Sequence, residues 1–172
     1  VIESIQTLNG NGPQDLNELV IRLASLMVSL GKDIPLEEAA KKVKENLFNG
    51  KGYAKFKEWI EAQGGDINSI EVSEKTKNIL SNQEGYISKI DALKIGKLVR
   101  ILGAGRLTKD DTINHEVGIL LNKKVGDKVE KGEKLLTIYY EDKEVTDKEI
   151  LDCFEITEQF IEKPSVIIDM IK

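Results

Sequence analysis

The 172-residue sequence contains a single cysteine, Cys153, and a single histidine, His115. One cysteine cannot form an internal disulfide, so a reducing compartment is expected, and we predict a cytoplasmic protein. No CxxC or HExxH spacing occurs, and the sequence therefore predicts no transition-metal site. We expect Cys153 to act as a small buried apolar residue. A general base is one interpretation of His115, which lies in a polar stretch, but an exposed loop residue is favoured.

Long apolar runs and an excess of positive charge are also missing. The longest apolar stretch, residues 19–30, is interrupted by Arg22 and is too short to span a bilayer, and no signal peptide is visible. The 25 Lys and Arg residues are interleaved with 30 Asp and Glu residues, which gives a net charge of −5. Because a nucleic-acid interface needs a basic face, we expect neither nucleic acid nor membrane among the partners.

Apolar residues in the first 65 positions recur at helical spacing and predict four helices. The first helix starts at Val1 without a capping residue or an initiator Met, so we expect a fragment of a longer protein. Apolar residues cover most of the second helix, which predicts burial on more than one side. The third begins at Pro35, and the fourth carries an aromatic stripe that we interpret as core packing rather than a ligand platform. The apolar residues of the second and fourth helices are Leu16, Leu19, Val20, Leu23, Leu26, Met27, Leu30, Tyr53, Phe56, Trp59 and Ile60.

A polar segment without a pattern, residues 66–75, marks a predicted domain boundary. It separates a helical part, residues 1–70, from an α+β domain, residues 71–172. The elements predicted in the second part are strands over residues 76–81 and 85–90, a helix from Asp91 to about Leu102, a short helix from Asp147 to Phe154, and a terminal strand after Pro164.

The second part is organised around residues 117–140. Gly126 and Gly132 lie six residues apart at points where a strand would have to turn, and glycine adopts positive φ at little steric cost. Two short strands with an ordered double bend between them are therefore predicted. The residues expected to point into one small shared core are Val125, Val129, Leu135 and Ile138.

Two features of this part have competing interpretations. Residues 103–106, Gly-Ala-Gly-Arg, could cradle an anion, but they follow a helix, so a helix-ending loop is favoured. Residues 125–135 resemble the pattern of lipoyl and biotinyl carrier domains, which carry a modified lysine at a hairpin tip. Lys143 would be that lysine, but it comes one residue late after Gly132 and a helix follows it. We expect a shared barrel-sandwich-hybrid scaffold, with a carrier or interaction module as the alternative function.

Three motifs together resemble the pyrimidine-nucleoside phosphorylases, a family that includes thymidine phosphorylase. They are N-G-N-G-P-x-D-L-x-E-L at residues 9–19, A-Q-G-G-D at residues 62–66, and L-G-A-G-R at residues 102–106 leading into D-T-I-N-x-x-V-G-I at residues 111–119. Each motif alone is weak, but their combination and spacing are specific. The chain resembles the C-terminal portion of such an enzyme over essentially its whole length.

The resemblance implies an α+β fold in which helices of the family's central α/β domain precede its C-terminal barrel-sandwich-hybrid domain. It implies that the parent protein is a pentosyltransferase acting on uridine or thymidine with phosphate, and a homodimer formed through a helical domain. The phosphate-binding and pyrimidine-gripping residues would lie upstream of Val1, so no catalytic residue is expected here and the fragment alone is expected to be inactive. Glu3 matches a glutamate that helps coordinate potassium in bacterial members; no other cofactor is implied.

Overall fold

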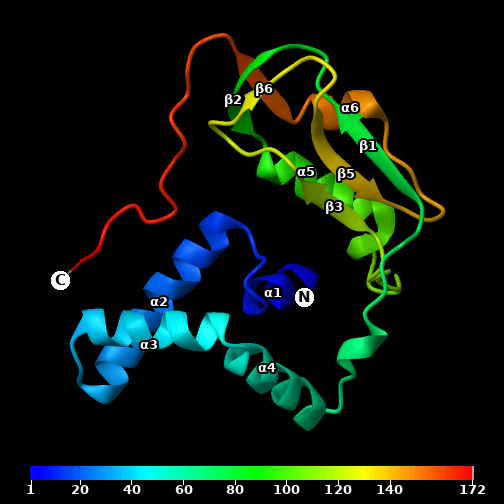
Figure 1. The fold of residues 1–172 in the computed structure, drawn as a ribbon. Coiled ribbons are helices and arrows are strands. Elements are labelled where there is room, and N and C mark those ends of the chain that lie inside the picture. Colours follow the sequence, from blue (N-terminus) through cyan, green and yellow to red (C-terminus); the bar gives the residue numbers. More distant parts are fainter. Residues whose placement is uncertain (172) are drawn as a thin grey trace. The chain divides into compact units, whose positions relative to one another are not determined.

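The computed structural model describes residues 1–171 and divides into two compact units (Figure 1). The first, called here the helical unit, consists of residues 1–70 together with the tail that begins at Ser165. The second, called the sheet unit, consists of residues 71–164. The predicted second domain extended to residue 172, whereas the tail after Pro164 groups with the helices.

Four α-helices and one short 3-10 helix make up residues 1–70. Their bounds are α1 Ile2–Leu8, α2 Gln14–Lys32, α3 Leu36–Phe48, α4 Lys51–Ala62 and η1 Ile67–Ser69. Pro13 and Pro35 immediately precede α2 and α3, with φ of −57° and −55°, which are the values that the proline ring imposes. α2 packs along α3, and α4 contacts both α1 and α3. The four predicted helices are therefore present.

The helical unit buries little apolar surface. Among its described residues, the buried apolar side chains are Ala39 and Leu47, both on α3. α2 was expected to be buried on more than one side, yet Leu23, Met27 and Leu30 are 52%, 73% and 84% exposed. These three residues follow the i, i+4, i+7 spacing of a single helix face. One apolar face of α2 is thus uncovered in this structure.

The prediction that the aromatic stripe of α4 is core packing was wrong. All residues of α4 are described, none of them is buried, and Trp59 is 55% exposed. The rings of Phe56 and Trp59 contact each other, with centroids 6.0 Å apart and a tilt of 50°, instead of entering a core. Helical spacing identifies residues that share a face, but whether neighbours cover that face is decided by the rest of the fold.

Two small antiparallel sheets and three helical segments make up the sheet unit (Figure 1). The bounds are β1 Thr76–Leu80, β2 Gly85–Ile90, α5 Ala92–Val99, η2 Arg100–Ala104, β3 Gly118–Leu121, β4 Lys128–Val129, β5 Lys134–Tyr139, α6 Asp147–Leu151 and β6 Phe154–Thr157. The strand orders are β1-β5-β3 in one sheet and β4-β2-β6 in the other. The fold is α+β, as predicted.

Strand β6 was missed by the sequence prediction. The short helix predicted to reach Phe154 ends at Leu151, and the chain then pairs antiparallel with β2, with Ile156 opposite Ile87. Phe154 and Ile156 alternate with Glu155 at strand spacing, but Phe154 also continues the helical spacing from Ile150, so the two patterns overlap.

The terminal strand predicted after Pro164 was wrong. The described residues of this tail form no strand, and Ile168 and Ile171 are each 97% exposed. The Arg22 guanidinium lies 3.2 Å from the Met170 sulfur. Alternating apolar residues form a strand only where another strand pairs with them, and none does so here.

The core of the sheet unit lies on both faces of β5. Leu135 joins Ile87 and Val129 in a small cluster, against which Val125 packs. Ile138 was expected there as well, but it belongs to a larger cluster on the other face, because residues three apart on a strand point to opposite sides. The larger cluster comprises Ile79, Leu98, Leu102, Val117, Leu136, Ile138, Val145, Ile150 and Cys153.

Within residues 1–171 the strands form two separate sheets and no closed barrel, so the expected carrier-like scaffold is not confirmed. No helix in the described part of the chain is both long enough and apolar enough to cross a membrane.

Gly126 and Gly132 both adopt positive φ, 86° and 85°, as predicted for the two bends. They differ in their surroundings. A Cβ built on Gly126 would lie 2.7 Å from the Cα of Lys163, whose ammonium pairs with Asp127 at 2.5 Å. A Cβ built on Gly132 would meet nothing within 4 Å. The first bend is therefore restricted by both backbone conformation and space, and the second by conformation alone.

We expect Gly132→Ala to destabilise the sheet unit by about 1 kcal/mol, the cost of placing an L side chain at positive φ. Gly126→Ala should cost roughly 2 kcal/mol or more, because the segment around Lys163 must also move. Urea unfolding followed by circular dichroism measures both. Gly96→Ala, in the interior of α5 with open space around it, is the control and should be neutral or slightly stabilising. Equal losses for the two bend variants would contradict the close approach of Lys163.

Candidate functional site

The loop of residues 103–117, between η2 and β3, contains the third sequence motif. Gly103 ends the helical turn with φ of 112°, which favours glycine. Its carbonyl accepts a hydrogen bond from the Asn114 N–H at 2.9 Å. The Asn114 side-chain oxygen in turn accepts one from the Glu116 N–H at 2.9 Å. The loop therefore starts and ends at one point, as compact surface loops do.

Asp111 orders the far end of this loop. Its carboxylate accepts hydrogen bonds from the N–H of Leu107 at 2.7 Å, and from the N–H and O–H of Thr108 at 2.8 and 2.7 Å. The Thr108 N–H foremost, followed by the Thr108 hydroxyl and the Leu107 N–H, holds the pKa of Asp111 below its usual value. Nearby Lys143 adds a smaller effect. The ionised carboxylate is thus the form that stabilises the loop.

Arg106 and His115 lie in this loop, and both are exposed, which confirms the interpretation of His115. The N-terminus of α5 would be the natural anion site, but Asp91 fills it by accepting a hydrogen bond from the Lys94 N–H at 2.9 Å. Residues 103–106 lie at the opposite end of the helical segment, where the dipole disfavours an anion. The arrangement favours a helix-ending loop over an anion cradle.

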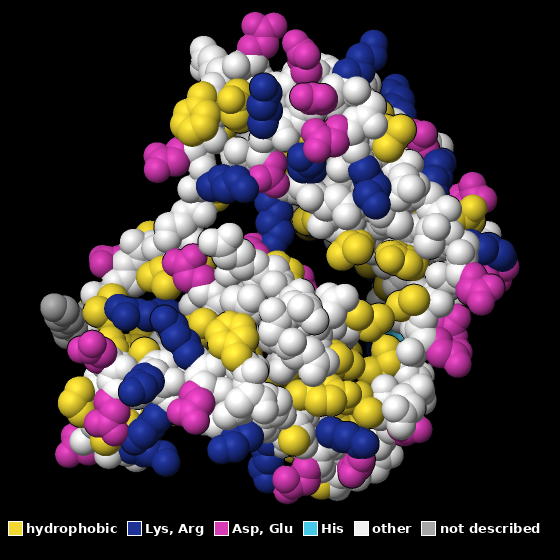
Figure 2. Space-filling model, in the orientation of Figure 1, with side chains coloured by type: hydrophobic (Ala, Val, Ile, Leu, Met, Phe, Trp, Pro, Cys, Tyr) yellow, Lys and Arg dark blue, Asp and Glu magenta, His cyan; other side chains and the backbone are white. Residues whose placement is uncertain are grey.

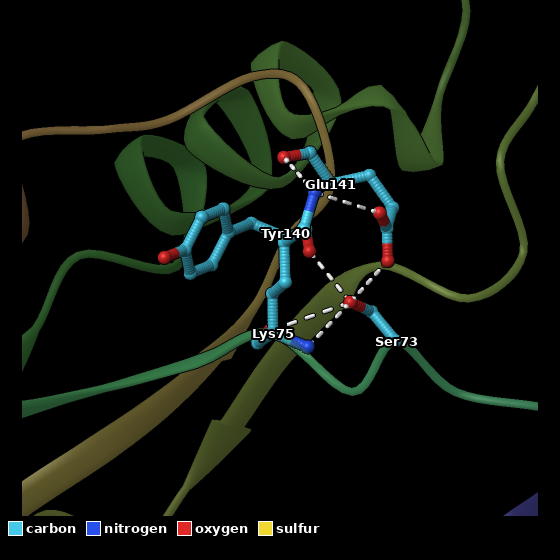
Figure 3. Close-up of polar contacts among 4 residues, drawn as sticks. All are labelled: Ser73, Lys75, Tyr140 and Glu141. Carbon is cyan, nitrogen blue, oxygen red and sulfur yellow. Dashed lines mark hydrogen bonds and ion pairs between the residues drawn. The ribbon is translucent and has the colours of Figure 1, made fainter.

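A polar cluster that sequence reasoning did not find joins the start of the sheet unit to the end of β5 (Figure 3). The Ser73 hydroxyl donates to the Tyr140 carbonyl at 2.6 Å and to Glu141 Oε1 at 2.5 Å. The Lys75 ammonium lies 3.2 Å from Glu141 Oε2. No local motif could have revealed the cluster, because Ser73 and Glu141 are 68 residues apart in the sequence.

The Ser73 cluster is structural rather than catalytic. Ser73 is 3% exposed, and its single hydroxyl hydrogen is shared between acceptors on Tyr140 and Glu141, the two residues that follow β5. Its oxygen accepts the Lys75 N–H at 3.0 Å. The Ser73 hydroxyl hydrogen bond, followed by that of Lys75, lowers the pKa of Glu141, so the carboxylate stays an acceptor and not a proton donor. A nucleophile needs access to substrate and a free base, and Ser73 has neither.

Lys143 and Cys153 were the other reactive groups considered. Lys143 is exposed between β5 and α6, and the capping box of Thr146 and Glu149 starts a helix three residues later. A carrier lysine at a hairpin tip would need a strand there instead. Cys153 is 2% exposed, its thiol donates to the Glu149 carbonyl at 3.2 Å, and burial raises its pKa. The prediction that Cys153 is a small buried residue is confirmed.

Glu3 lies in the first turn of α1, where its side chain is exposed and its carbonyl accepts a hydrogen bond from the Thr7 hydroxyl at 2.8 Å. Residues 1–171 contain no group of three or more His, Cys, Asp or Glu side chains that could hold a metal ion.

Comparison with known proteins gives one consistent result. Residues 86–155 match the family model of the pyrimidine nucleoside phosphorylase C-terminal domain. The chain is 47% identical over 146 residues to the pyrimidine-nucleoside phosphorylase of Bacillus subtilis, covering 81% of this chain and 34% of that protein. It is 45% identical over 152 residues to that of Staphylococcus epidermidis, covering 84% and 35%, and 43% identical over 166 residues to that of Staphylococcus haemolyticus, covering 91% and 38%. The chain spans little more than a third of the length of these relatives.

Asp111→Asn should loosen the loop without unfolding the sheet unit. The amide keeps one acceptor oxygen but loses the charge, so we expect amide exchange at Leu107 and Thr108 to rise about tenfold. Because the folded-state pKa of Asp111 is lowered, its contribution is present above the usual pKa and is lost as pH falls through the folded value, so protection should fade only below about pH 4.

Hydrogen exchange measured by NMR as a function of pH tests this expectation. Asp110→Asn is the matched control, since the neighbouring Asp110 is exposed and does not make these bonds. Protection that is equal in both variants, or that fades at higher pH, would contradict the role given to Asp111.

Proposed function

Because the chain belongs to the pyrimidine-nucleoside phosphorylase family and matches its C-terminal portion, we propose that its parent protein catalyses the reversible phosphorolysis of pyrimidine nucleosides. A phosphate oxygen would form a bond to the anomeric carbon of uridine or thymidine, and the bond to the pyrimidine nitrogen would break, giving free base and pentose 1-phosphate. The observation that supports this proposal is the 43–47% identity over 146–166 residues, a length that requires both units.

We propose further that the chain alone is inactive. Phosphorolysis depends on holding phosphate against the sugar and on stabilising a departing pyrimidine anion, which are tasks of positioning and electrostatics. On the family resemblance, the groups that perform these tasks belong to the portion of the enzyme that this chain does not match.

The two units would contribute differently. The sheet unit has two apolar clusters of its own, so we propose that it folds independently, as a relative of the barrel-sandwich hybrid that does not carry a modified lysine. The helical unit has little core of its own, and Leu23, Met27 and Leu30 lie exposed on α2. We propose that this face packs against the remaining polypeptide of the parent.

Partners and location follow the same proposal. Nucleoside and phosphate would be the substrates, and the parent would be a cytoplasmic homodimer formed through a helical domain that this chain does not contain. In the view of Figure 2, acidic and basic side chains are interleaved with no continuous basic area. That distribution supports an enzyme without nucleic-acid or membrane partners.

Glu3 is proposed as one potassium ligand of the complete enzyme. Glu3 supplies one exposed carboxylate, and residues 1–171 contain no group of three or more His, Cys, Asp or Glu side chains around it that could hold a metal ion. On the family resemblance the other ligands are largely carbonyl oxygens. The remaining ligands would have to come from the rest of the parent.

The proposal that the chain alone is inactive is tested by mixing it with the missing part of the enzyme. The chain alone, with uridine or thymidine, excess phosphate and potassium, should show no loss of nucleoside absorbance above a heat-killed control. Addition of a polypeptide that corresponds to the remaining part of the Bacillus subtilis relative should restore phosphorolysis. Activity of the chain alone would overturn the assignment of the catalytic groups to the missing part.

Paired variants make the mixing experiment specific. Met27→Glu combined with Leu30→Glu should abolish restoration, because it places two charges on the apolar face of α2. Lys41→Glu combined with Lys131→Glu, at exposed positions on α3 and in the sheet unit, should leave restoration unchanged. A failure of both variants would point to general misfolding, which circular dichroism would reveal.

Glu3→Gln should raise the potassium concentration needed for half-maximal restored activity by roughly tenfold, since a neutral amide oxygen replaces a charged ligand. Activity at saturating potassium should return to that of the unaltered mixture. Glu37→Gln, in the first turn of α3, is the control for loss of a first-turn charge. An unchanged potassium dependence would contradict the role of Glu3.

A further inference from the structure

The chain is fixed to the sheet unit almost as soon as it leaves the helical unit. Ser73, three residues after Ile70, is 3% exposed, and its N–H donates to the Glu116 carbonyl at 2.9 Å. Its hydroxyl reaches the Tyr140 carbonyl and the Glu141 carboxylate (Figure 3). Three separate hydrogen-bonding contacts therefore hold one buried residue.

Lys75 reinforces this attachment. Its carbonyl accepts a hydrogen bond from the Tyr140 N–H at 3.1 Å, which continues the pairing of β1 with β5 by one step. Its N–H donates to the Ser73 hydroxyl oxygen at 3.0 Å, and its ammonium lies 3.2 Å from Glu141 Oε2. We call the contacts of Ser73 and Lys75 with Tyr140 and Glu141 the Ser73 latch.

The preceding three residues are held much less. Ile70, Glu71 and Val72 make no hydrogen bond or ion pair with another residue of the described range 1–171. Val72 is 45% exposed, although it is apolar. On the other side, η1 is closed by Asp66, whose carboxylate accepts the Asn68 N–H at 2.8 Å. A weakly held segment of three residues thus lies between two ordered ends.

We propose that the Ser73 latch is a conformational device that confines the flexible connection between the two units to Ile70–Val72. Three extended residues reach at most about 10 Å, whereas opening the latch would free residues 70–75 and allow about 20 Å. The latch therefore limits the reach of this connection, which is one of two because the chain returns to the helical unit at Ser165. This inference does not depend on the reaction proposed above.

Spin labels on the two units test the proposal in the full chain. Lys41→Cys and Lys131→Cys place labels at exposed positions, and buried Cys153 does not compete for the reagent. The distribution of distances between the two labels should be about twofold broader in Ser73→Ala than in the otherwise unaltered chain, in proportion to the reach of the freed connection. Lys89→Ala, which breaks the exposed Lys89–Glu155 ion pair elsewhere in the sheet unit, should leave the width unchanged. Equal widths of the distance distribution with and without the Ser73→Ala substitution would overturn the proposal.

Limited proteolysis gives a second readout that does not need labels. A glutamate-specific protease should cut the unaltered chain after Glu71 but rarely after Glu74, because the Ser73 latch protects Glu74. Ser73→Ala should raise the ratio of cleavage at Glu74 to cleavage at Glu71 about tenfold. If Ser73→Ala fails to fold, Glu141→Ala, at a more exposed residue, should raise the same ratio. Comparable cleavage after Glu71 and Glu74 in the unaltered chain would contradict the proposal.

Discussion

Burial of β5 on both faces is the constraint on which the sheet unit depends. Leu135 is fully buried in the small cluster, while Leu136 and Ile138 are buried in the larger one. Both edges of the strand are paired, with β1 on one side and β3 on the other. Its ends are fixed as well, because the Glu133 carbonyl accepts the Ser81 N–H at 2.8 Å and the Tyr140 N–H donates to Lys75. Displacement of this one strand would therefore open both apolar clusters and the Ser73 latch together.

The helical unit has no comparable centre. Ala39 and Leu47 are its buried apolar residues within the described range, whereas the sheet unit encloses two clusters. Helices gain most of their stability in proteins from packing an apolar face, and the apolar face of α2 remains exposed. On the proposal made above, the remaining polypeptide of the parent covers this face. The family model matches residues within the sheet unit, which is the part with a core of its own.

The sequence was informative where local geometry decides the outcome. Positive φ at Gly126 and Gly132, the helix start at Asp91 and the start of α3 at Pro35 depend on a few neighbouring residues, and each was found. Prediction from the sequence failed where contacts between distant segments decide the structure. Whether the stripe around Trp59 is covered, whether residues 154–157 pair with β2, and whether Ser73 meets Glu141 all depend on partners that spacing alone does not identify. Burial of Ile138 in the other cluster followed from strand alternation and could have been predicted.

The family resemblance rests on glycine-containing motifs and not on catalytic residues, and steric constraint explains this. Gly12 has an ideal Cβ position only 2.2 Å from the Thr7 hydroxyl oxygen, and a Cβ built on Gly65 would lie 2.9 Å from Cγ2 of Ile60. Gly103 adopts a φ of 112° at the neck of its loop. At such positions nearly any other residue strains the fold, so the residue type is fixed as firmly as a catalytic group would fix it. The residue types in the motifs that carried the resemblance are therefore set by backbone geometry. They identify the scaffold, and they bear on chemistry only through the proposal made above for the parent protein.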